Sequence, residues 1–408
     1  MRLSTRLAAA FALTFVAAFS VRAARAQSPT NINWRAAEAE SLTNHVQLTF
    51  PEQFVKAGEA YFNPDARWVI FQAVPVPTNG SPADTIYSMY VAKVRYSRTG
   101  LIVGLEKPIL VSPPGSANTC GWFHPTDPGR IIFGSTLVKP IEGPEAGYQR
   151  GANSYRWAFP AQTDVVTTVV PQMVRDYERN ARGAHSFAAL FDQKPPAPTP
   201  LWTRPGYDAE CSFSADGRLI LHTRVNPKTN DPDLYLYDTL TGASKPIVVK
   251  PGYDGGPFFS PDSRRICYRS DRRGNDLLQL FVTDLVPTTD SAGQPTVELI
   301  EHQLTDDENV NWAPFWHPSG KFLIYASSKI SHHNYEVFSI EAPTFGADED
   351  TTPLRTRRLT YADGFDGLPV FSNDGRWMMW TSQRGAMIDG ETKPSSQIWA
   401  AQVVNAAP

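Results

Sequence analysis

The sequence predicts an all-β fold, a six-bladed β-propeller with four-stranded blades. The main observation is a short phrase that occurs six times, in which an aromatic residue precedes a turn and an alternating apolar strand. Repetition of strand-rich units at a spacing of roughly 40 to 60 residues is typical of solenoids and propellers. The six copies begin at Phe62, Phe123, Phe213, Phe259, Trp316 and Phe371.

The unit that begins at Phe213 illustrates one predicted blade. Residues 214–217, Ser-Ala-Asp-Gly, form a hairpin turn in which glycine supplies a positive φ, and the second strand covers 218–223. Two further strands follow at 234–239 and 245–249. In the other units we expect third strands at 86–94, 155–159, 280–284, 337–340 and 398–404, and fourth strands at 108–111, 302–305 and 357–360, with that of the second unit somewhere in 165–202.

The two ends of the chain supply the second observation. The last unit stops after its third strand, while the segment His45–Phe50 stands alone before the first unit and resembles the fourth strand near Glu301. An N-terminal strand that completes the last blade would close the ring and remove its exposed edges. The chain is therefore expected to form one closed domain over residues 45–408.

The segments outside the repeats suggest export and one insertion. Residues 1–26 combine a basic start, an apolar run and a small-x-small site, as in a secretory signal peptide that is removed, and 27–44 form an N-terminal extension. We expect a periplasmic or secreted protein that is monomeric and has no stable membrane span after cleavage. An insertion at about 137–205 carries an amphipathic stretch, Pro171–Leu190, and is interpreted either as a lid or partner-docking element or as plain loop growth.

Charge and cysteine content exclude some functions. The formal net charge is −3, so no basic field is available to hold nucleic acid or an anionic membrane. Cys120, Cys211 and Cys267 have no diagnostic spacing, which leaves one disulfide plus a buried thiol, or three free buried thiols, as alternatives. The serine-hydrolase elbow, the zinc-protease histidine pair, the Walker loop and the dinucleotide glycine fingerprint are all missing from the sequence.

The repeats resemble the TolB-like family of WD-type β-propellers. The resemblance depends on the phrases QLTF, QLTD and RLTY before the repeats and FSPD or FSND within them, and it covers about residues 40 to 405. Two units depart from the pattern, with Ala66 and Ser263 where glycine is expected in the turn. The resemblance implies a periplasmic platform for protein interaction or ligand binding, although the architecture alone does not dictate a function.

A polar residue stands five residues before the aromatic anchor in five of the six units. One mouth of the central channel would then carry a polar ring to which Glu59 and Glu210 also contribute. Such a ring could bind a ligand or a divalent cation such as calcium, with Asp208, Asp254 and Asp366 as the candidate metal ligands, but each side chain could equally cap the turn into its own strand. The ring positions are Asn118, Asp208, Asp254, Asn311 and Asp366, with Ala57 in the first unit.

Two functions are compatible with these features. The first is a non-enzymatic scaffold in the cell envelope that binds a protein partner or an envelope component, with no certain cofactor. The alternative is a metal-assisted lyase or hydrolase that acts on a saccharide or a small ester at the channel, in which a bound cation polarises the substrate. The first function is preferred because no catalytic motif was found.

Overall fold

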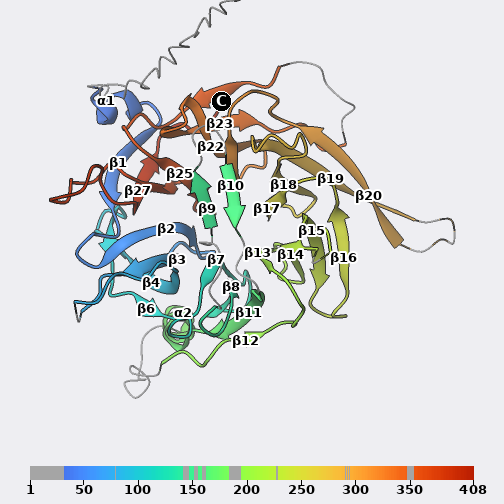
Figure 1. The fold of residues 1–408 in the computed structure, drawn as a ribbon, viewed down its shortest axis with the longest axis horizontal. Coiled ribbons are helices and arrows are strands. Elements are labelled where there is room, and N and C mark those ends of the chain that lie inside the picture. The colour runs from blue at the N-terminus through green and yellow to red at the C-terminus, as the bar shows by residue number, and fades with distance from the viewer. Residues whose placement is uncertain are drawn as a thin grey trace, which may run out of the picture. The chain divides into compact units, whose positions relative to one another are not determined.

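The computed structural model describes residues 32–78, 80–140, 147–150, 155–158, 162–182, 194–226, 228–289, 291, 293, 295–346 and 353–408. The predicted signal peptide, 1–26, lies outside these residues. Within residues 32–408 six sheets form a ring (Figure 1), which confirms the predicted six-bladed propeller. No described helix is long and apolar enough to cross a bilayer.

The blades follow one another along the chain, and each is an antiparallel meander. Blade 1 contains β2 (Phe54–Phe62), β3 (Trp68–Pro75), β4 (Ser88–Tyr96) and β5 (Ile102–Leu105), and β6 (Ile109–Leu110) also pairs with β4. Blade 2 contains β7 (Asn118–Phe123), β8 (Arg130–Ser135), β11 (Asp164–Val169) and β12 (Thr199–Pro200). Blade 3 contains β13 (Asp208–Phe213), β14 (Leu219–Val225), β15 (Pro232–Asp238) and β16 (Ser244–Val248).

The second half of the ring repeats this order. Blade 4 contains β17 (Asp254–Phe259), β18 (Arg265–Ser270), β19 (Gln279–Thr289) and β20 (Pro295–Gln303). Blade 5 contains β21 (Asn311–Trp316), β22 (Phe322–Ser331), β23 (Asn334–Glu341) and β24 (Thr356–Arg358). Blade 6 contains β25 (Asp366–Phe371), β26 (Trp377–Ser382), β27 (Gln397–Val403) and β1 (Leu42–Gln47).

Strand β1 closes the ring as predicted, because it pairs antiparallel with β27 from Leu42↔Val403 to Gln47↔Trp399. The strand begins three residues before the predicted start at His45, and the short helix α1 (Trp34–Glu38) precedes it. Blade 6 is therefore built from two segments that lie far apart in the chain. Its outer strand, β1, is held to the other three strands of the blade by pairing with β27 and not by a short connecting loop.

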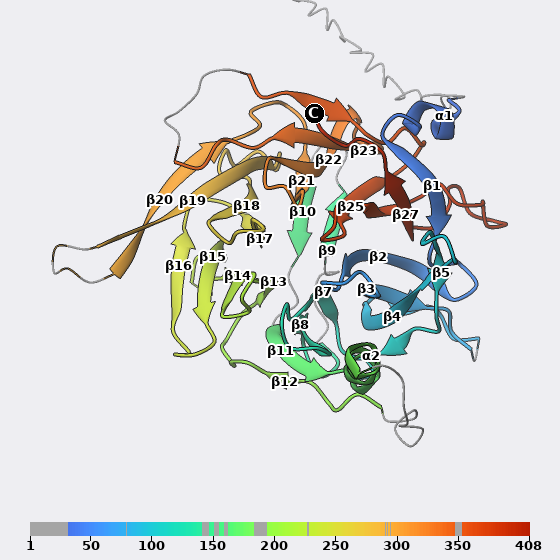
Figure 2. The ribbon, with the colours of Figure 1, turned by 180° about the vertical axis from the view of Figure 1, so that it is seen from behind.

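The third strand of blade 2 was predicted wrongly. Residues 155–158 do form a strand, β10 (Tyr155–Ala158), but among the described residues it pairs only with β9 (Gly147–Arg150), and the blade uses β11 instead. The apolar alternation of residues 155–159 resembles that of a blade strand. Only the pairing with β8 shows that β11, and not this segment, belongs to the blade. Figures 1 and 2 both show the β9–β10 hairpin over the centre of the ring.

Residues 171–182 of the predicted amphipathic stretch form helix α2 (Pro171–Arg182), between the third and fourth strands of blade 2 in the chain, and the rest of the stretch, 183–190, lies outside the described residues. Asp176 anchors α2 to blade 1, because it accepts a hydrogen bond from Trp68 Nε1 at 3.3 Å and pairs with Lys93 Nζ at 2.7 Å. The predicted insertion is thus two segments separated by β11, and the second one is packed against two blades.

The repeated turns explain the recurrent phrase. In three units the serine after the aromatic anchor donates a hydrogen bond to the aspartate two residues later and accepts one from the first residue after the turn, as Ser214 does with Asp216 and Leu219. Ala66 and Ser263 adopt φ values of 55° and 56°, so they take the left-handed conformation that glycine takes in the other turns. The equivalent serines are Ser260 and Ser372.

Candidate functional site

The predicted polar ring lies at the beginning of the first strand of each blade. These strands, β2, β7, β13, β17, β21 and β25, contact one another around the axis and are called the inner strands. We call the end of the ring where they begin the entry face. The five polar ring residues open their inner strands, whereas Ala57 is the fourth residue of β2. All six are buried, with at most 5% of their surface exposed.

The ring asparagines are hydrogen-bonded to the turn that enters their own strand and also to the preceding blade. The Asn118 side-chain amide donates to the carbonyls of Ser116 and Tyr87 at 2.8 and 3.0 Å. Asn311 accepts from Ser327 Oγ at 2.8 Å and donates to Asp307 at 2.9 Å. These contacts fit the capping interpretation, in which the side chain orders the turn that enters the strand.

The three candidate metal ligands also lie apart, each with its own partner. The Asp208 carboxylate lies 3.1 Å from His222 Nδ1, and Asp254 accepts a hydrogen bond from the Lys250 amide at 3.1 Å. Burial raises the pKa of Asp254 to about 7, although Ser270 and Arg272 lower it. Among the described residues no three acidic, histidine or cysteine side chains are grouped as a metal site would require.

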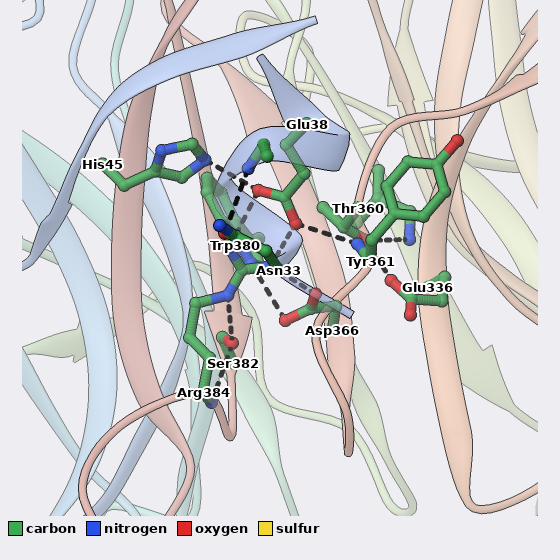
Figure 3. Close-up of polar contacts among 12 residues, drawn as sticks. Asn33, Glu38, His45, Glu336, Thr360, Tyr361, Asp366, Trp380, Ser382 and Arg384 are labelled. Carbon is green, nitrogen blue, oxygen red and sulfur yellow. Dashed lines mark hydrogen bonds and ion pairs between the residues drawn. The ribbon is translucent and has the colours of Figure 1, made fainter. Parts of the chain in front are cut away.

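Asp366 belongs to a buried ion network at the entry face (Figure 3). Arg384, fully buried, pairs with Asp366 at 2.5 Å and with both carboxylate oxygens of Glu38 at 3.0 and 3.1 Å. Glu38 also bonds His45 Nε2 at 2.7 Å and accepts from the Tyr361 amide at 2.8 Å. Because Glu38 ends α1 and His45 lies in β1, the network binds the N-terminal segment to the last blade.

The residue two positions after each ring position has a left-handed conformation in all six inner strands. The pairing of each inner strand with its neighbour is interrupted there, as in a β-bulge. Five of these residues are not glycine, and strained backbone of this kind is concentrated at functional sites. They are Glu59, Cys120, Glu210, Gly256, Ala313 and Leu368, with φ values between 46° and 59°.

These bulges bring the predicted Glu59 together with Cys120, which the prediction had missed as a site residue. Cys120 Sγ donates to Glu59 Oε1 at 2.8 Å, and the Thr119 hydroxyl lies 3.3 Å from Oε2. Burial, together with the negative charge of Glu210, raises the pKa of Glu59, and burial raises that of the Cys120 thiol well above its usual range. All three cysteines are free and buried, which agrees with the alternative of three free thiols and not with that of one disulfide.

Glu210, the other predicted carboxylate, receives several donors. Its oxygens accept from the Tyr253 hydroxyl at 2.8 Å and the Gly256 amide at 2.6 Å, and Arg269 Nη2 lies 3.3 Å away. A Cβ at Gly256 would lie 1.6 Å from Arg269 Nη1. Because the bulge residue of blade 4 is glycine and has no side chain, the Arg269 guanidinium can occupy this space. Glu59, Cys120, Glu210, Tyr253 and Arg269 form what we call the channel cluster.

Below the channel cluster four aromatic rings from different blades close the channel. We call these four rings, Tyr61, Trp122, Phe258 and Phe315, the aromatic plug. Each of them contacts the other three, with ring centroids between 4.9 and 6.4 Å apart. Such tilted and edge-to-face contacts add to the stability gained from burying the rings. The channel is therefore not an open pore, and the two faces of the ring offer separate sites.

A cavity of about 270 Å³, the funnel, opens on the face opposite the entry face. All six blades contribute to it, because the inner strands end there. Its wall is rich in aromatic and proline side chains, and Trp122, Phe258 and Phe315, each half-buried, contribute from the aromatic plug. A second cavity of about 330 Å³, between α2 and blades 1 and 2, shares Pro64, Phe123 and Pro125 with the funnel.

The sequence could have indicated part of this arrangement. In the same alignment that exposed the polar ring, the positions three residues before the aromatic anchor read Glu, Cys, Glu, Gly, Ala and Leu, and those one residue before it include Tyr61, Trp122, Phe258 and Phe315. The contribution of Arg269 has no such signal, because it lies at the end of a second strand and reaches the channel only beside Gly256.

Comparison with known proteins gives one curated match. No protein-family model matches the chain. The Tol-Pal system protein TolB of Wolinella succinogenes is 31% identical over 173 residues, which are 42% of this chain and 36% of the relative. The match thus spans about a third of the length of the relative.

Several solved structures are similar to this chain, among them a TolB protein and an oligogalacturonate lyase. TolB from Acinetobacter baumannii has a TM-score of 0.49 at 15% identity, covering 85% of this chain and 65% of that one. The oligogalacturonate lyase of Vibrio parahaemolyticus has a TM-score of 0.43 at 12% identity, covering 87% and 92%. Because both TM-scores are below 0.5, the fold assignment depends on the sheet order of this chain. Its six repeats and its closed ring identify the chain as a six-bladed β-propeller, and its partial sequence match is to TolB.

Proposed function

We propose that this protein is an exported, non-enzymatic propeller that binds a protein partner of the cell envelope through the funnel. The observation that carries the proposal is the funnel itself, an apolar depression of about 270 Å³ built by all six blades. Central pockets that accept an aromatic or aliphatic anchor, with polar groups around them, are typical of protein interfaces. The turns around the funnel supply a polar group at its rim at the exposed Asn373.

The size of the funnel favours a side chain of a partner over a free ligand. Small-molecule sites are usually cavities of about 300 to 1,000 Å³ that enclose most of the ligand. The funnel is at the lower limit of this range, and it is lined mainly by apolar side chains. Export is supported by the N-terminal sequence, and a role in the Tol-Pal system by the name of the curated relative.

The metal-assisted lyase or hydrolase has less support. It would need carboxylates that converge on one cation, whereas Asp208, Asp254 and Asp366 are each bound within their own blade. The described residues offer no observation that favours this alternative over the scaffold.

Binding of purified Pal protein, measured by titration calorimetry, tests the proposal. Ala215 and Asn373 are exposed residues that line the funnel, so Ala215→Arg and Asn373→Arg should obstruct it without disturbing the core. We expect each variant to bind at least about tenfold more weakly, or 1.4 kcal/mol. Leu240→Arg, at a 77% exposed position outside the funnel, is the control and should bind like the unmodified protein. The funnel would be rejected as the site for this partner if the two rim variants bound Pal as tightly as the unmodified protein does, or if the unmodified protein did not bind Pal.

A further inference from the structure

The outer half of blade 4 extends beyond the rest of its sheet. Strands β19 and β20 pair continuously from Phe281↔Gln303 to Thr289↔Pro295, whereas the pairing of β18 with β19 ends at Asp284. Residues 285–289 and 295–299 therefore form a two-stranded ribbon, which we call the arm. Figures 1 and 2 show β19 and β20 running past the other strands of the blade. A two-stranded ribbon on its own is only marginally stable in water, so the arm gains from any further strand that pairs with it.

One face of the arm is apolar. Opposed residues share a face and successive residues alternate, so the register places Leu285 and Pro287 of β19 on the same face as Leu299 and Val297 of β20. Val297 and Leu299 are 49% and 42% exposed. Exposed apolar side chains side by side on a sheet face indicate a contact surface more than scattered ones do.

The free edge of the arm is that of β20. Within the described residues β20 pairs only with β19, so its outer backbone groups are left for another strand. Natural edge strands are usually protected by proline, lysine or a bulge. On the β19 side Pro287 lacks an N–H, but residues 296–303 contain neither proline nor lysine, and the pairing of β20 with β19 has no bulge. The edge is thus open to strand addition.

A second copy of this chain is a poor match for the edge. We considered symmetric antiparallel pairings of β20 with itself that keep like faces together and overlap by seven residues or more. From the strand limits, these place Glu298 opposite the same residue of the second copy, or oppose Glu301 to Val297 or Leu299. Glu301 already pairs with Arg272 at 2.5 Å, and like charges directly opposite each other destabilise a sheet.

We propose that the β20 edge of the arm binds an extended strand of a partner protein by β-augmentation. In this mode main-chain hydrogen bonds supply affinity and alternate side chains supply specificity. Glu298 is the only charged residue in the two strands of the arm, so the matching strand carries lysine or arginine opposite it. On the apolar face the partner strand presents β-branched residues beside Val297 and Leu299. This site is separate from the funnel and does not depend on the function proposed for it.

Hydrogen exchange with a defined peptide probe tests this site. The probe is a nine-residue peptide in which valine alternates with lysine or threonine, and a matched peptide carries glutamate in place of lysine. At a saturating concentration the cationic probe should slow amide exchange of residues 296–300 at least about tenfold, and the acidic peptide should not. Glu298→Lys should reverse this preference, whereas Glu308→Lys, at a side chain 85% exposed outside the arm, should leave it unchanged.

A shortened protein separates the arm from the blade. Val286 and Glu298 are directly opposed, so a two-residue Asn-Gly turn can join them in place of residues 287–297. This variant should fold and should lose at least about tenfold in affinity for the cationic probe. The proposal is wrong if the cationic probe protects no arm residue, or if the shortened protein binds it equally well. Self-association in sedimentation that protects 296–300 without peptide would assign the edge to a second copy instead.

Discussion

The ion network that closes the ring is open to a direct energetic test through Arg384→Met. Arg384 has no exposed side-chain surface, and it neutralises Glu38 and Asp366, which are also buried. Removing one partner of a buried ion pair leaves an uncompensated charge, which costs about 3 to 5 kcal/mol. We expect the upper half of this range, because methionine keeps the stacking volume near Trp34 and Trp380 but leaves two carboxylates without their cation.

Arg272 provides a matched control for this substitution. It follows Ser270 by two residues as Arg384 follows Ser382, and in both cases Nε donates to that serine at 3.0 Å. The Arg272 side chain is 21% exposed and its main partner, Glu301, is 30% exposed. Partly exposed pairs are screened by solvent, so Arg272→Met should cost only about 1 kcal/mol.

Equilibrium urea unfolding of the mature protein measures both costs from the midpoint and slope of the transition. The double variant Glu38→Gln/Arg384→Met should lose less unfolding free energy than the two single variants lose together. The reason is that each single change leaves the other group without its charged partner. Equal losses for Arg384→Met and Arg272→Met, with additive behaviour in the double variant, would refute the closure role of the network.

Three further predictions concern single positions. Gly256→Ala should cost about 3 kcal/mol by displacing Arg269 from Glu210, and it should cost far less in an Arg269→Ala background; an unchanged cost there would mean that the backbone, not the guanidinium, requires glycine. Ala66→Gly should raise the free energy of unfolding by about 0.5 to 1 kcal/mol, because φ is 55° at this position; a loss in thermal or urea unfolding would contradict this explanation. For Asp254 the folded protein keeps a proton up to about pH 7 that the unfolded chain releases near pH 4, so stability falls as pH rises through this interval, and Asp254→Asn should flatten that part of the unfolding profile.

The channel shows how far the candidate site could be predicted. The recurrence of Asn118, Asp208 and their equivalents was visible in the sequence and does mark the start of five of the six inner strands. The strand geometry decides whether such a side chain points to the axis or into a blade. In the structure these side chains bond to turns and strands of the blades. The bulge two residues later turns Glu59 and Glu210 toward the channel cluster instead.

The sequence by itself determined the number of blades, their strand order and the closure of the ring, because turn chemistry and apolar alternation are local and recur in register. It did not identify the third strand of blade 2, since 155–158 and 164–169 both have strand character and only pairing with β8 selects one. The tertiary structure alone decided the aromatic plug, the funnel and the arm. The plug and the funnel depend on side chains from segments far apart in the chain, whose meeting is set by the ring. The arm depends on where the pairing of β18 with β19 ends, which no local pattern shows.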